Sequence, residues 1–489
     1  MLTLPAETRG PLWTRLIEAI ETYTREVASR PVAPALDAEA IRSRLAPFDF
    51  GQPVEPLEAL DFAVRGLWQH QVHTPHPCYF GLFNPAPSTM SIAGDALVAA
   101  FNPQLAAWSH SPFAAEVEQH LIGAFAGRFG YDPARAEGTF TSGGAEANHT
   151  ALLVAMTRAF PEVGRRGMLA LRSQPVLYVS PEGHHSILKA ARLSGIGAEA
   201  VREVRVDGSL HMIPDDLLAR IQEDREAGHT PFMVVATAGS TGAGVIDPIA
   251  DIAQIADEEG LWLHVDAAWG GAAMLVPEMR PLLEGINRAS SITFDAHKWL
   301  SVPMGAGLFL TRHPGLLERT FRVSTGYMPK DAAALPVADP YAHSMQWSRR
   351  FIGLKVFLPL AVAGWEGYEA AIRHQTAMGD LLRQRLQEEG WVIVNDTHLP
   401  LVNFVDGGRE GRSLAFLEGV AGDVVGSGEA WISTVNLREA GPALRACITH
   451  FGTGPEDLEV LIRALDRARS RHAPRVTSGE HESGEPAGA

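Results

Sequence analysis

One lysine of this sequence lies where a primary amine could do chemistry. Lys298 follows the apolar run 291–294 within Asp295-Ala296-His297-Lys298-Trp299, and such a run predicts a short buried strand. Partial burial at a strand end favours the neutral, nucleophilic form of an amine, which suits Schiff-base chemistry. The chain has only three other lysines, and their helical or polar surroundings predict solvated side chains: Lys189, Lys330 and Lys355.

Two further strand ends carry side chains of other types. The apolar run 261–265 ends in Asp266, and a charge at the end of a buried strand is costly unless it is paired or functional. His184 follows the run 176–180, where its planar ring could stack on a planar ligand. Each feature alone also has an ordinary explanation, which is a capping or turn carboxylate for Asp266 and a hydrogen-bonded histidine for His184.

A glycine-rich turn, Ser142-Gly143-Gly144-Ala145, leads into a predicted helix. Glycines let the backbone approach a ligand closely, and a helix N-terminus offers free N–H groups and a positive dipole end to an anion. The turn matches neither a dinucleotide-binding fingerprint nor a Walker-type loop, since the latter requires a lysine. Many such turns only change the direction of the chain, so the turn alone identifies no ligand.

The elements that carry these features bring them to one place. Between about residues 115 and 311, short apolar runs alternate with helical patterns, which predicts a mostly parallel sheet covered on both faces. Ligands of such sheets bind outside the carboxyl ends of the strands. An anion cradle, a stacking imidazole, a carboxylate and an amine at one edge suit pyridoxal phosphate, whose phosphate, ring, ring nitrogen and aldehyde need these four groups.

Two motifs extend this interpretation to a family. His-Val-Asp-Ala-Ala-Trp at 264–269 and Asp-Ala-His-Lys-Trp at 295–299 resemble the signatures of the pyridoxal-phosphate-dependent group II decarboxylases. This family includes the aromatic-L-amino-acid, glutamate and cysteine-sulfinate decarboxylases, and the resemblance runs from about residue 76 to 465. It implies that the chain removes carbon dioxide from an L-amino acid and releases an amine.

The resemblance implies a role for each matching residue. Lys298 would form the Schiff base with pyridoxal 5'-phosphate, Asp266 would pair with the pyridine nitrogen, and His184 would stack on the ring. Tyr327 matches a loop tyrosine that protonates the product carbon. The other implied cofactor contacts are Gly143, Gly144, Ala145, Thr241, Ala268, Asp295 and His297. Relatives often carry a hydroxyl residue at position 145 and Asn at position 295, so this chain departs from the family pattern there.

The resemblance also implies fold type I of the pyridoxal enzymes, an α/β fold with a mostly parallel seven-stranded sheet and a small C-terminal α+β domain. We expect an N-terminal helical segment at 1–80, the large cofactor-binding domain at 81–355, the small domain at 356–470 and a disordered tail at 471–489. Apolar residues recur at helical spacing over 12–27, and this stripe must be buried against its own domain or a second subunit. The family implies a homodimer with shared active sites.

Composition argues against several other classes of protein. The 489 residues are 46% hydrophobic and 20% charged, as in globular proteins, and the net charge of −16 argues against a general nucleic-acid binder. Two cysteines, Cys78 and Cys447, cannot form a disulfide framework or a four-thiolate metal site, and we expect no metal. No apolar run approaches the roughly 20 residues of a membrane span and no signal peptide is evident, so we expect a cytoplasmic enzyme that does not bind membranes.

The substrate prediction depends on one segment. Trp108-Ser109-His110-Ser111-Pro112 resembles the aromatic-type segment of the family more than the glutamate-type segment, although Ala106 stands where aromatic-type relatives have a pocket Phe. The alternatives within the family are a glutamate or cysteine-sulfinate decarboxylase and an aldehyde synthase, which would usually carry Phe at 327. A fold type I aminotransferase or lyase is not expected to combine Asp-Ala-His-Lys-Trp with a loop tyrosine. A pyridoxal-sensing regulator would need a DNA-binding segment, for which neither terminus has the length or charge.

Overall fold

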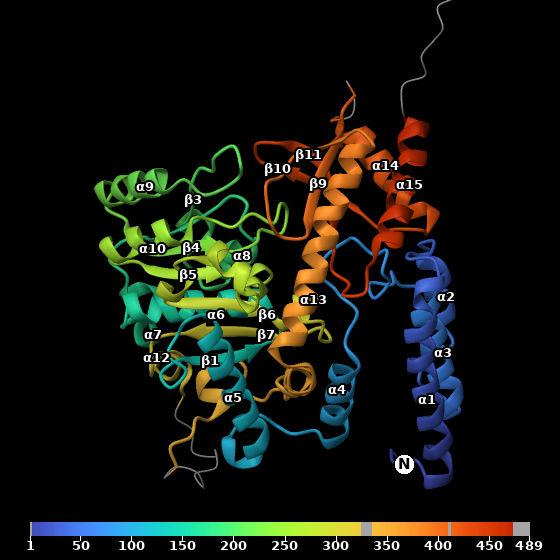
Figure 1. Ribbon diagram of the computed structural model, residues 1–489. Helices are drawn as coiled ribbons and strands as arrows, with labels where there is room; N and C mark the ends of the chain where they lie inside the picture. The colour runs from blue at the N-terminus through green and yellow to red at the C-terminus, as the bar shows by residue number, and fades with distance from the viewer. Residues whose placement is uncertain (1, 324–334, 409–411, 473–489) are drawn as a thin grey trace, which may run out of the picture.

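A computed structural model describes residues 2–323, 335–408 and 412–472 of the chain. Its larger body contains seven strands (Figure 1): β1 (Glu137–Thr141), β2 (Pro175–Val179), β3 (Val201–Glu203), β4 (Thr230–Thr237), β5 (Trp262–Asp266), β6 (Ser291–Asp295) and β7 (Gly307–Thr311). They form one sheet in the order β1-β7-β6-β5-β4-β2-β3. All neighbours are parallel except β7, which runs antiparallel to both β1 and β6. The predicted mostly parallel seven-stranded sheet is confirmed.

Helices cover both faces of this sheet because its strands are apolar on both sides. Val234 and Ala236 of β4 lie in one buried cluster, while the alternating Met233 and Val235 lie in another. The first cluster is covered by α5 (Pro112–Arg128), α9 (Pro214–Glu226), α10 (Ile249–Glu258) and α13 (Leu354–Glu388). The second is covered by α6 (Gly144–Ala159), α8 (Ser186–Leu193) and α12 (Leu316–Phe321).

A second, smaller sheet follows in the chain. It consists of β8 (Trp391–Ile393), β9 (Leu401–Asp406), β10 (Ser433–Leu437) and β11 (Gly441–Cys447), all antiparallel, in the order β10-β11-β9-β8. α14 (Leu414–Ser427) and α15 (Pro455–His472) pack on it in a separate core. α13 reaches from the large sheet to this unit and bends at Gly364, whose φ of 63° suits glycine. The predicted small α+β domain is confirmed, whereas strands β1, β3 and β10 were not predicted individually.

Short helical segments complete the described chain. The α-helices among them are α4 (Thr89–Phe101), α7 (Val163–Arg166) and α11 (Ala296–Trp299). The 3-10 segments are Val27–Ser29, Trp108–His110, Gly167–Ala170, Ala198–Ala200, Gly270–Leu275, Pro277–Leu283, Ile286–Arg288 and Pro340–His343.

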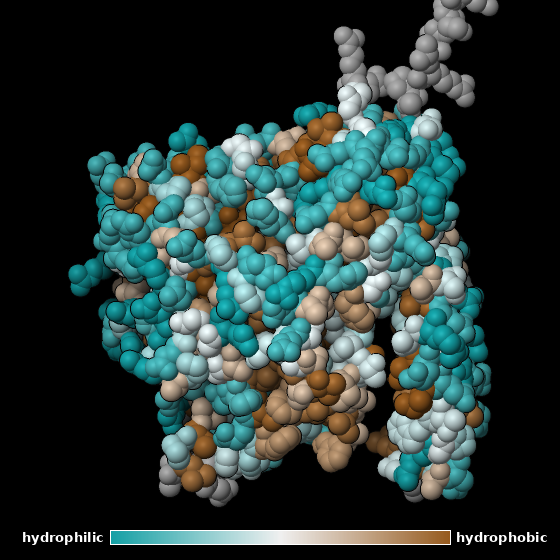
Figure 2. Space-filling model, in the orientation of Figure 1, coloured by the Kyte–Doolittle hydropathy of each residue, from teal (hydrophilic) through white to brown (hydrophobic). Residues whose placement is uncertain are grey.

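The N-terminal helices stand beside the body with little contact along their length (Figure 1). They are α1 (Ala6–Glu26), α2 (Ala38–Leu45) and α3 (Pro56–Gln69), and of α1 only Ala19 is buried. Trp13 and Ile17 of the predicted apolar stripe are more than half exposed. Figure 2 shows an open gap between these helices and the body, with apolar side chains on both sides of it. The stripe is therefore not buried within one chain.

The structure corrects one expectation about the lysines. Lys355 was predicted to be solvated, but it is buried at the start of α13, where its Nζ donates to the Met304 carbonyl oxygen at 2.7 Å. Its own helix approaches α4 so closely that a Cβ on Gly94 would lie 2.9 Å from the Lys355 Cα. Lys189 is exposed, as predicted, and Lys330 lies outside the described residues.

Candidate active site

The carboxyl ends of the large sheet's parallel strands bring most of the predicted site residues to one edge. Asp266 ends β5 and Lys298 lies in α11, directly after β6. His184 and Thr241 lie in the loops after β2 and β4. His184 and Asp266 line one small cavity, and the Lys298 Nζ lies 3.1 Å from Oδ2 of Asp295.

Lys298 occupies a partly buried position at this edge. Its Nζ lies 3.1 Å from Oδ2 of Asp295, and its side chain is 19% exposed. The same amine lies 5.6 Å from the centre of the Phe83 ring. The amine is therefore held by one carboxylate and one aromatic face, and its side chain remains partly exposed.

Asp266 is a buried carboxylate, 6% exposed, with a fixed orientation. Its Oδ2 accepts a hydrogen bond of 2.7 Å from Nδ2 of Asn148 in α6, and its Oδ1 accepts one of 3.2 Å from the Ala268 N–H. Two neutral donors hold this carboxylate, and the structure places no cation on it within the described residues. A protonated ring nitrogen would supply the missing positive charge.

The glycine-rich turn forms a cradle at the start of α6. Hydrogen bonds from the Glu146 and Ala147 N–H groups go to the Gly143 carbonyl oxygen, while no acceptor among the described residues faces the N–H groups of Gly144 and Ala145. A Cβ on Gly144 would lie 2.9 Å from Oδ2 of Asp295 and 3.3 Å from the Ala268 Cβ. Only glycine leaves this space open, and the free N–H groups suit a phosphate.

Two histidines flank the cradle and the cavity. His297 is buried, and its Nδ1 accepts from the Ala306 N–H at 3.2 Å. Burial lowers the pKa of His297, although the Asp295 charge opposes this effect. His184 is exposed at the cavity rim, and its Nδ1 accepts from the Ser186 N–H at 3.2 Å. Desolvation by its surroundings lowers the pKa of His184 as well, so both rings are neutral near pH 7.

One buried cation was missed from the sequence. Arg445 of β11 is only 2% exposed. Its Nε donates to the Thr241 carbonyl oxygen at 2.9 Å, and its Nη1 donates to the Gly81 carbonyl oxygen at 2.7 Å. Its Nη2 is buried and has no hydrogen-bond partner among the described residues. The guanidinium carbon lies 5.1 Å from the centre of the Phe83 ring, which also faces Lys298. An arginine within an otherwise apolar strand was the available signal.

A cavity of about 650 Å³ opens between the large sheet and the small one. Its lining includes Leu82, His184, Thr241, Trp431 and Arg445. This volume falls within the range of roughly 300–1,000 Å³ that is usual for small-molecule sites.

The residues present fit pyridoxal phosphate. The cradle has free N–H donors and space that a Cβ would fill, Asp266 lines a small cavity with His184 and has no cationic partner among the described residues, and the amine of Lys298 is partly exposed. Tyr327 lies outside the described residues. In residues 2–323, 335–408 and 412–472, no group of three or more His, Cys, Asp or Glu side chains could hold a metal ion. No helix in that part of the chain is long and apolar enough to cross a membrane.

Comparison with known proteins agrees with this chemistry. Residues 40–405 match the family model described as the pyridoxal-dependent decarboxylase conserved domain. The chain is 29% identical to an aromatic-L-amino-acid decarboxylase of Bacillus atrophaeus over 94% of this chain and 96% of that protein. It is 31% identical to the acidic amino acid decarboxylase GADL1 of Bos taurus over 72% and 67% of the two chains. The crystal structure of Oryza sativa TDC with PLP and tryptamine shares the fold, with a TM-score of 0.90, 22% identity and coverage of 96% and 99%.

Proposed function

Because the chain belongs to the pyridoxal-dependent decarboxylase family, we propose that it decarboxylates an aromatic L-amino acid to the corresponding amine and carbon dioxide. Membership makes it a carboxy-lyase that uses pyridoxal 5'-phosphate. When bound, pyridoxal phosphate supplies an electron sink for cleavage of the bond between the α-carbon and the carboxylate. The chain's own residues must bind it, orient the substrate and supply protons.

In this proposal Lys298 would hold the cofactor through its amine. The amine is paired with Asp295 at 3.1 Å, which can retain a proton that leaves Nζ. Asp266 would hold a proton on the ring nitrogen, because a buried carboxylate without a cationic partner stabilises a positive charge beside it. His184 and Ala268 would bracket the ring, and neutral His184 can stack without repelling a cationic ring.

The cradle would bind the phosphate. Free N–H groups of Gly144 and Ala145 at the N-terminus of α6 suit a dianion, with Gly143 leaving room for the backbone turn. His297 and Asp295 lie against this cradle, since Cβ atoms on Gly143 and Gly144 would contact them. Thr241 lines the cavity beside Arg445 and lies on the substrate side.

The unpartnered Nη2 of Arg445 is the observation that best supports an amino acid as the substrate. A buried guanidinium with one free donor, close to the same Phe83 ring as the Lys298 amine, suits a carboxylate ligand. The carboxylate of the substrate would accept a hydrogen bond from the free Nη2 of Arg445. When the carboxylate leaves as neutral carbon dioxide, Arg445 loses its anionic partner. The amine product then binds less tightly than the substrate, which favours its release.

The lining of the cavity favours a substrate with an aromatic side chain over one with an acidic side chain. Trp431 lines the cavity with its indole ring, and the buried Tyr79 ring packs against it with ring centres 5.2 Å apart. Among the described lining residues, the other charged groups are Glu182, Glu203 and Arg438, and Arg438 is already paired with Glu203. A second substrate carboxylate would therefore meet acids rather than a free cation. The aromatic-type relative, which matches nearly the whole chain, points the same way.

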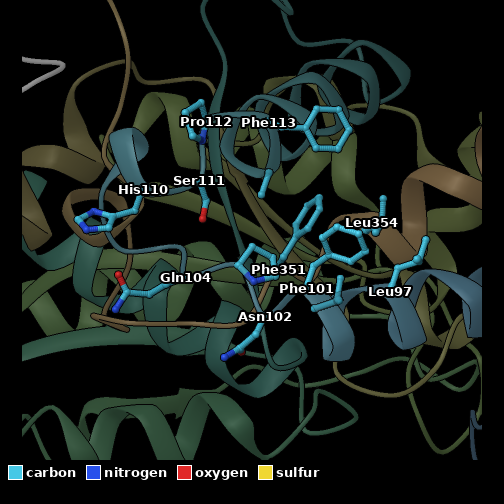
Figure 3. A pocket seen from close by; sticks show the side chains of 13 residues that line it. Leu97, Phe101, Asn102, Gln104, His110, Ser111, Pro112, Phe113, Phe351 and Leu354 are labelled. Atoms are coloured by element: carbon cyan, nitrogen blue, oxygen red, sulfur yellow. The ribbon is translucent and has the colours of Figure 1, made fainter. Parts of the chain in front are cut away.

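We extend the proposal to a homodimer with shared active sites. A second cavity, an apolar groove of about 790 Å³, is lined by Leu97, Phe101, Phe113, Phe351 and Leu354 (Figure 3). Phe101 and Phe113 are 81% and 68% exposed, which is unusual for such large apolar side chains. A second copy would cover this groove together with the exposed apolar residues of the N-terminal helices.

The groove also contains part of the aromatic-type segment. His110 and Ser111 line it, and none of its lining residues belongs to the cavity that contains Arg445 and His184. The segment would therefore act on the substrate bound by the other subunit of the dimer. The two free cysteines, both buried, fit the proposed cytoplasmic location.

Tyr327 completes the proposed machinery as the proton donor to the product carbon. Tyr327→Phe should bind cofactor normally and form far less amine, and by resemblance to the aldehyde synthases it should release aldehyde, ammonia and peroxide with consumption of oxygen. Amine output equal to that of the native protein would assign the proton transfer to another group.

A panel of L-amino acids tests the substrate. The purified holoenzyme would be assayed for amine and carbon dioxide with tryptophan, tyrosine, phenylalanine, dopa, glutamate and cysteine sulfinate, with Lys298→Ala as the inactive control. We expect kcat/KM at least tenfold higher for one or more aromatic substrates than for either acid. A preference for glutamate or cysteine sulfinate would overturn the aromatic assignment and leave the decarboxylase intact.

A further inference from the structure

A row of buried polar side chains lies behind Asp266, on the side away from the cavity. Trp262 Nε1 lies 2.9 Å from Ser291 Oγ, which lies 2.8 Å from His264 Nδ1. His264 Nε2 lies 3.0 Å from Asn148 Oδ1, and Asn148 Nδ2 lies 2.7 Å from Asp266 Oδ2. The side chains of Ser291, His264 and Asn148 are fully buried.

The two ends of this row, together with a neutral His264, determine the direction of every hydrogen bond in it. Trp262 has only a donor, and the Asp266 carboxylate only accepts. Ser291 must therefore accept from Trp262 and donate its own proton to His264 Nδ1. His264 then carries its proton on Nε2 and donates it to Asn148 Oδ1, and Asn148 donates from Nδ2 to Asp266. Thr293 Oγ1 lies 3.3 Å from the same His264 nitrogen and is the more distant acceptor.

This directed row requires a neutral His264. Burial lowers the pKa of His264 from 6.5 to about 4, against the opposing charge of Asp266. Trp262 comes from β5, Ser291 from β6 and Asn148 from α6, and none of these three is charged. Asp266 is the one charged group that contributes to the His264 pKa, so the imidazole stays neutral through the working range of most enzymes.

The row also connects Asp266 with the turn that carries His184. Asn148 Nδ2 makes a second hydrogen bond of 2.8 Å to Ser186 Oγ, and the Ser186 N–H donates to His184 Nδ1 at 3.2 Å. A single amide group therefore fixes both the carboxylate that faces the ring nitrogen and the turn that holds the stacking imidazole. Its orientation depends on His264, which occupies its only acceptor.

We propose that the row Trp262–Ser291–His264–Asn148 sets the orientation and charge of Asp266, and that Asn148 and His264 are positioning residues which keep the cofactor's ring nitrogen protonated. A hydrogen-bond chain in which every member donates in the same direction is polarised toward its acceptor end. At that end the effect is to stabilise the Asp266 carboxylate as an anion. The proposal rests on the family's cofactor and is independent of the choice of substrate.

The isosteric variant Asn148→Asp gives the sharpest test. It places a second carboxylate 2.7 Å from Asp266 Oδ2, so the two acids must share one proton, and Asp266 loses charge toward the ring. We expect the 15N resonance of labelled pyridoxal phosphate, bound to the holoenzyme, to move toward that of an unprotonated ring nitrogen. We also expect the dissociation constant of the cofactor to rise about 10- to 100-fold, as for loss of a charged hydrogen bond.

A matched control separates this effect from general loss of stability. Asn395 donates to the Ala243 and Leu401 carbonyl oxygens and has no contact with Asp266, so Asn395→Asp should alter stability without moving the ring-nitrogen resonance. If Asn148→Asp does not fold, His264→Leu tests the same row, because it frees the amide of Asn148 to rotate. That variant should shift the resonance in the same direction by a smaller amount.

An unchanged resonance and an unchanged dissociation constant in the variant that folds would overturn the proposal. Failure of the aromatic-substrate assignment would give a different result. The native holoenzyme would then have a protonated ring nitrogen and would turn over no aromatic amino acid.

Discussion

Replacing Arg445 with Met should test recognition of the substrate carboxylate, with the amine product as the control for the other contacts of this side chain. The guanidinium makes two hydrogen bonds to backbone carbonyl oxygens and keeps Nη2 free beside Phe83. Met keeps an unbranched side chain against that ring and removes the cation. A hydrogen bond between charged groups contributes about 1.5–3 kcal/mol, so kcat/KM for the amino acid should fall roughly 10- to 150-fold.

The amine product provides the internal control, because it has lost the carboxylate that Arg445 would bind. Measured as a competitive inhibitor, the amine should bind to Arg445→Met and to the native enzyme with inhibition constants within about threefold of each other. Arg438→Met is the matched arginine control. Its exposed pair with Glu203 contributes little, and kcat/KM should change by less than about threefold. Equal losses for amino acid and amine, or full activity in Arg445→Met, would refute the reasoning.

The remaining predictions concern pH and assembly. The unfolded chain takes up a proton on His264 as the pH falls below about 6.5, whereas the buried ring resists protonation until about pH 4. Near pH 5 this costs the folded state about 2 kcal/mol. His264→Gln should therefore show a smaller fall in thermal midpoint between about pH 8 and pH 5 than the native protein, and an equal fall would contradict the buried neutral ring. Burial raises the pKa of Asp247 to about 6, so this group stabilises the folded state as the pH falls. Because the native protein and His264→Gln both contain Asp247, its effect cancels in the comparison. Phe101→Asp with Phe113→Asp should give a monomer by light scattering, whereas Leu169→Asp, at an equally exposed position outside the groove, should leave the dimer intact.

The residues at the strand ends were predictable because their signal is local. A continuous apolar run identifies a buried strand, the parallel topology places its carboxyl end at the ligand edge, and Lys298 and Asp266 follow directly in sequence. The turn at 142–145 is similarly readable, since glycines just before a helix indicate an exposed N-terminus.

What sequence reasoning missed depends on contacts between distant segments. Arg445 reaches the Gly81 carbonyl oxygen across 364 positions of the chain, and no local pattern reports that approach. Lys355 has a surface-like helical pattern, yet the close packing of α13 on α4 buries it. Asn148 and His264 occupy interior positions of a helix and a strand, where periodicity predicts burial and does not reveal their shared hydrogen bonds.

The most direct test of the active site is to find which lysine holds the cofactor. The holoenzyme would be reduced with borohydride, digested and mapped by mass spectrometry, with Lys298→Ala treated in parallel. We predict a pyridoxyl group on the peptide that contains Lys298 and none in the variant. A pyridoxyl group on Lys189, Lys330 or Lys355 of the native enzyme would contradict the assignment of this sheet edge as the active site.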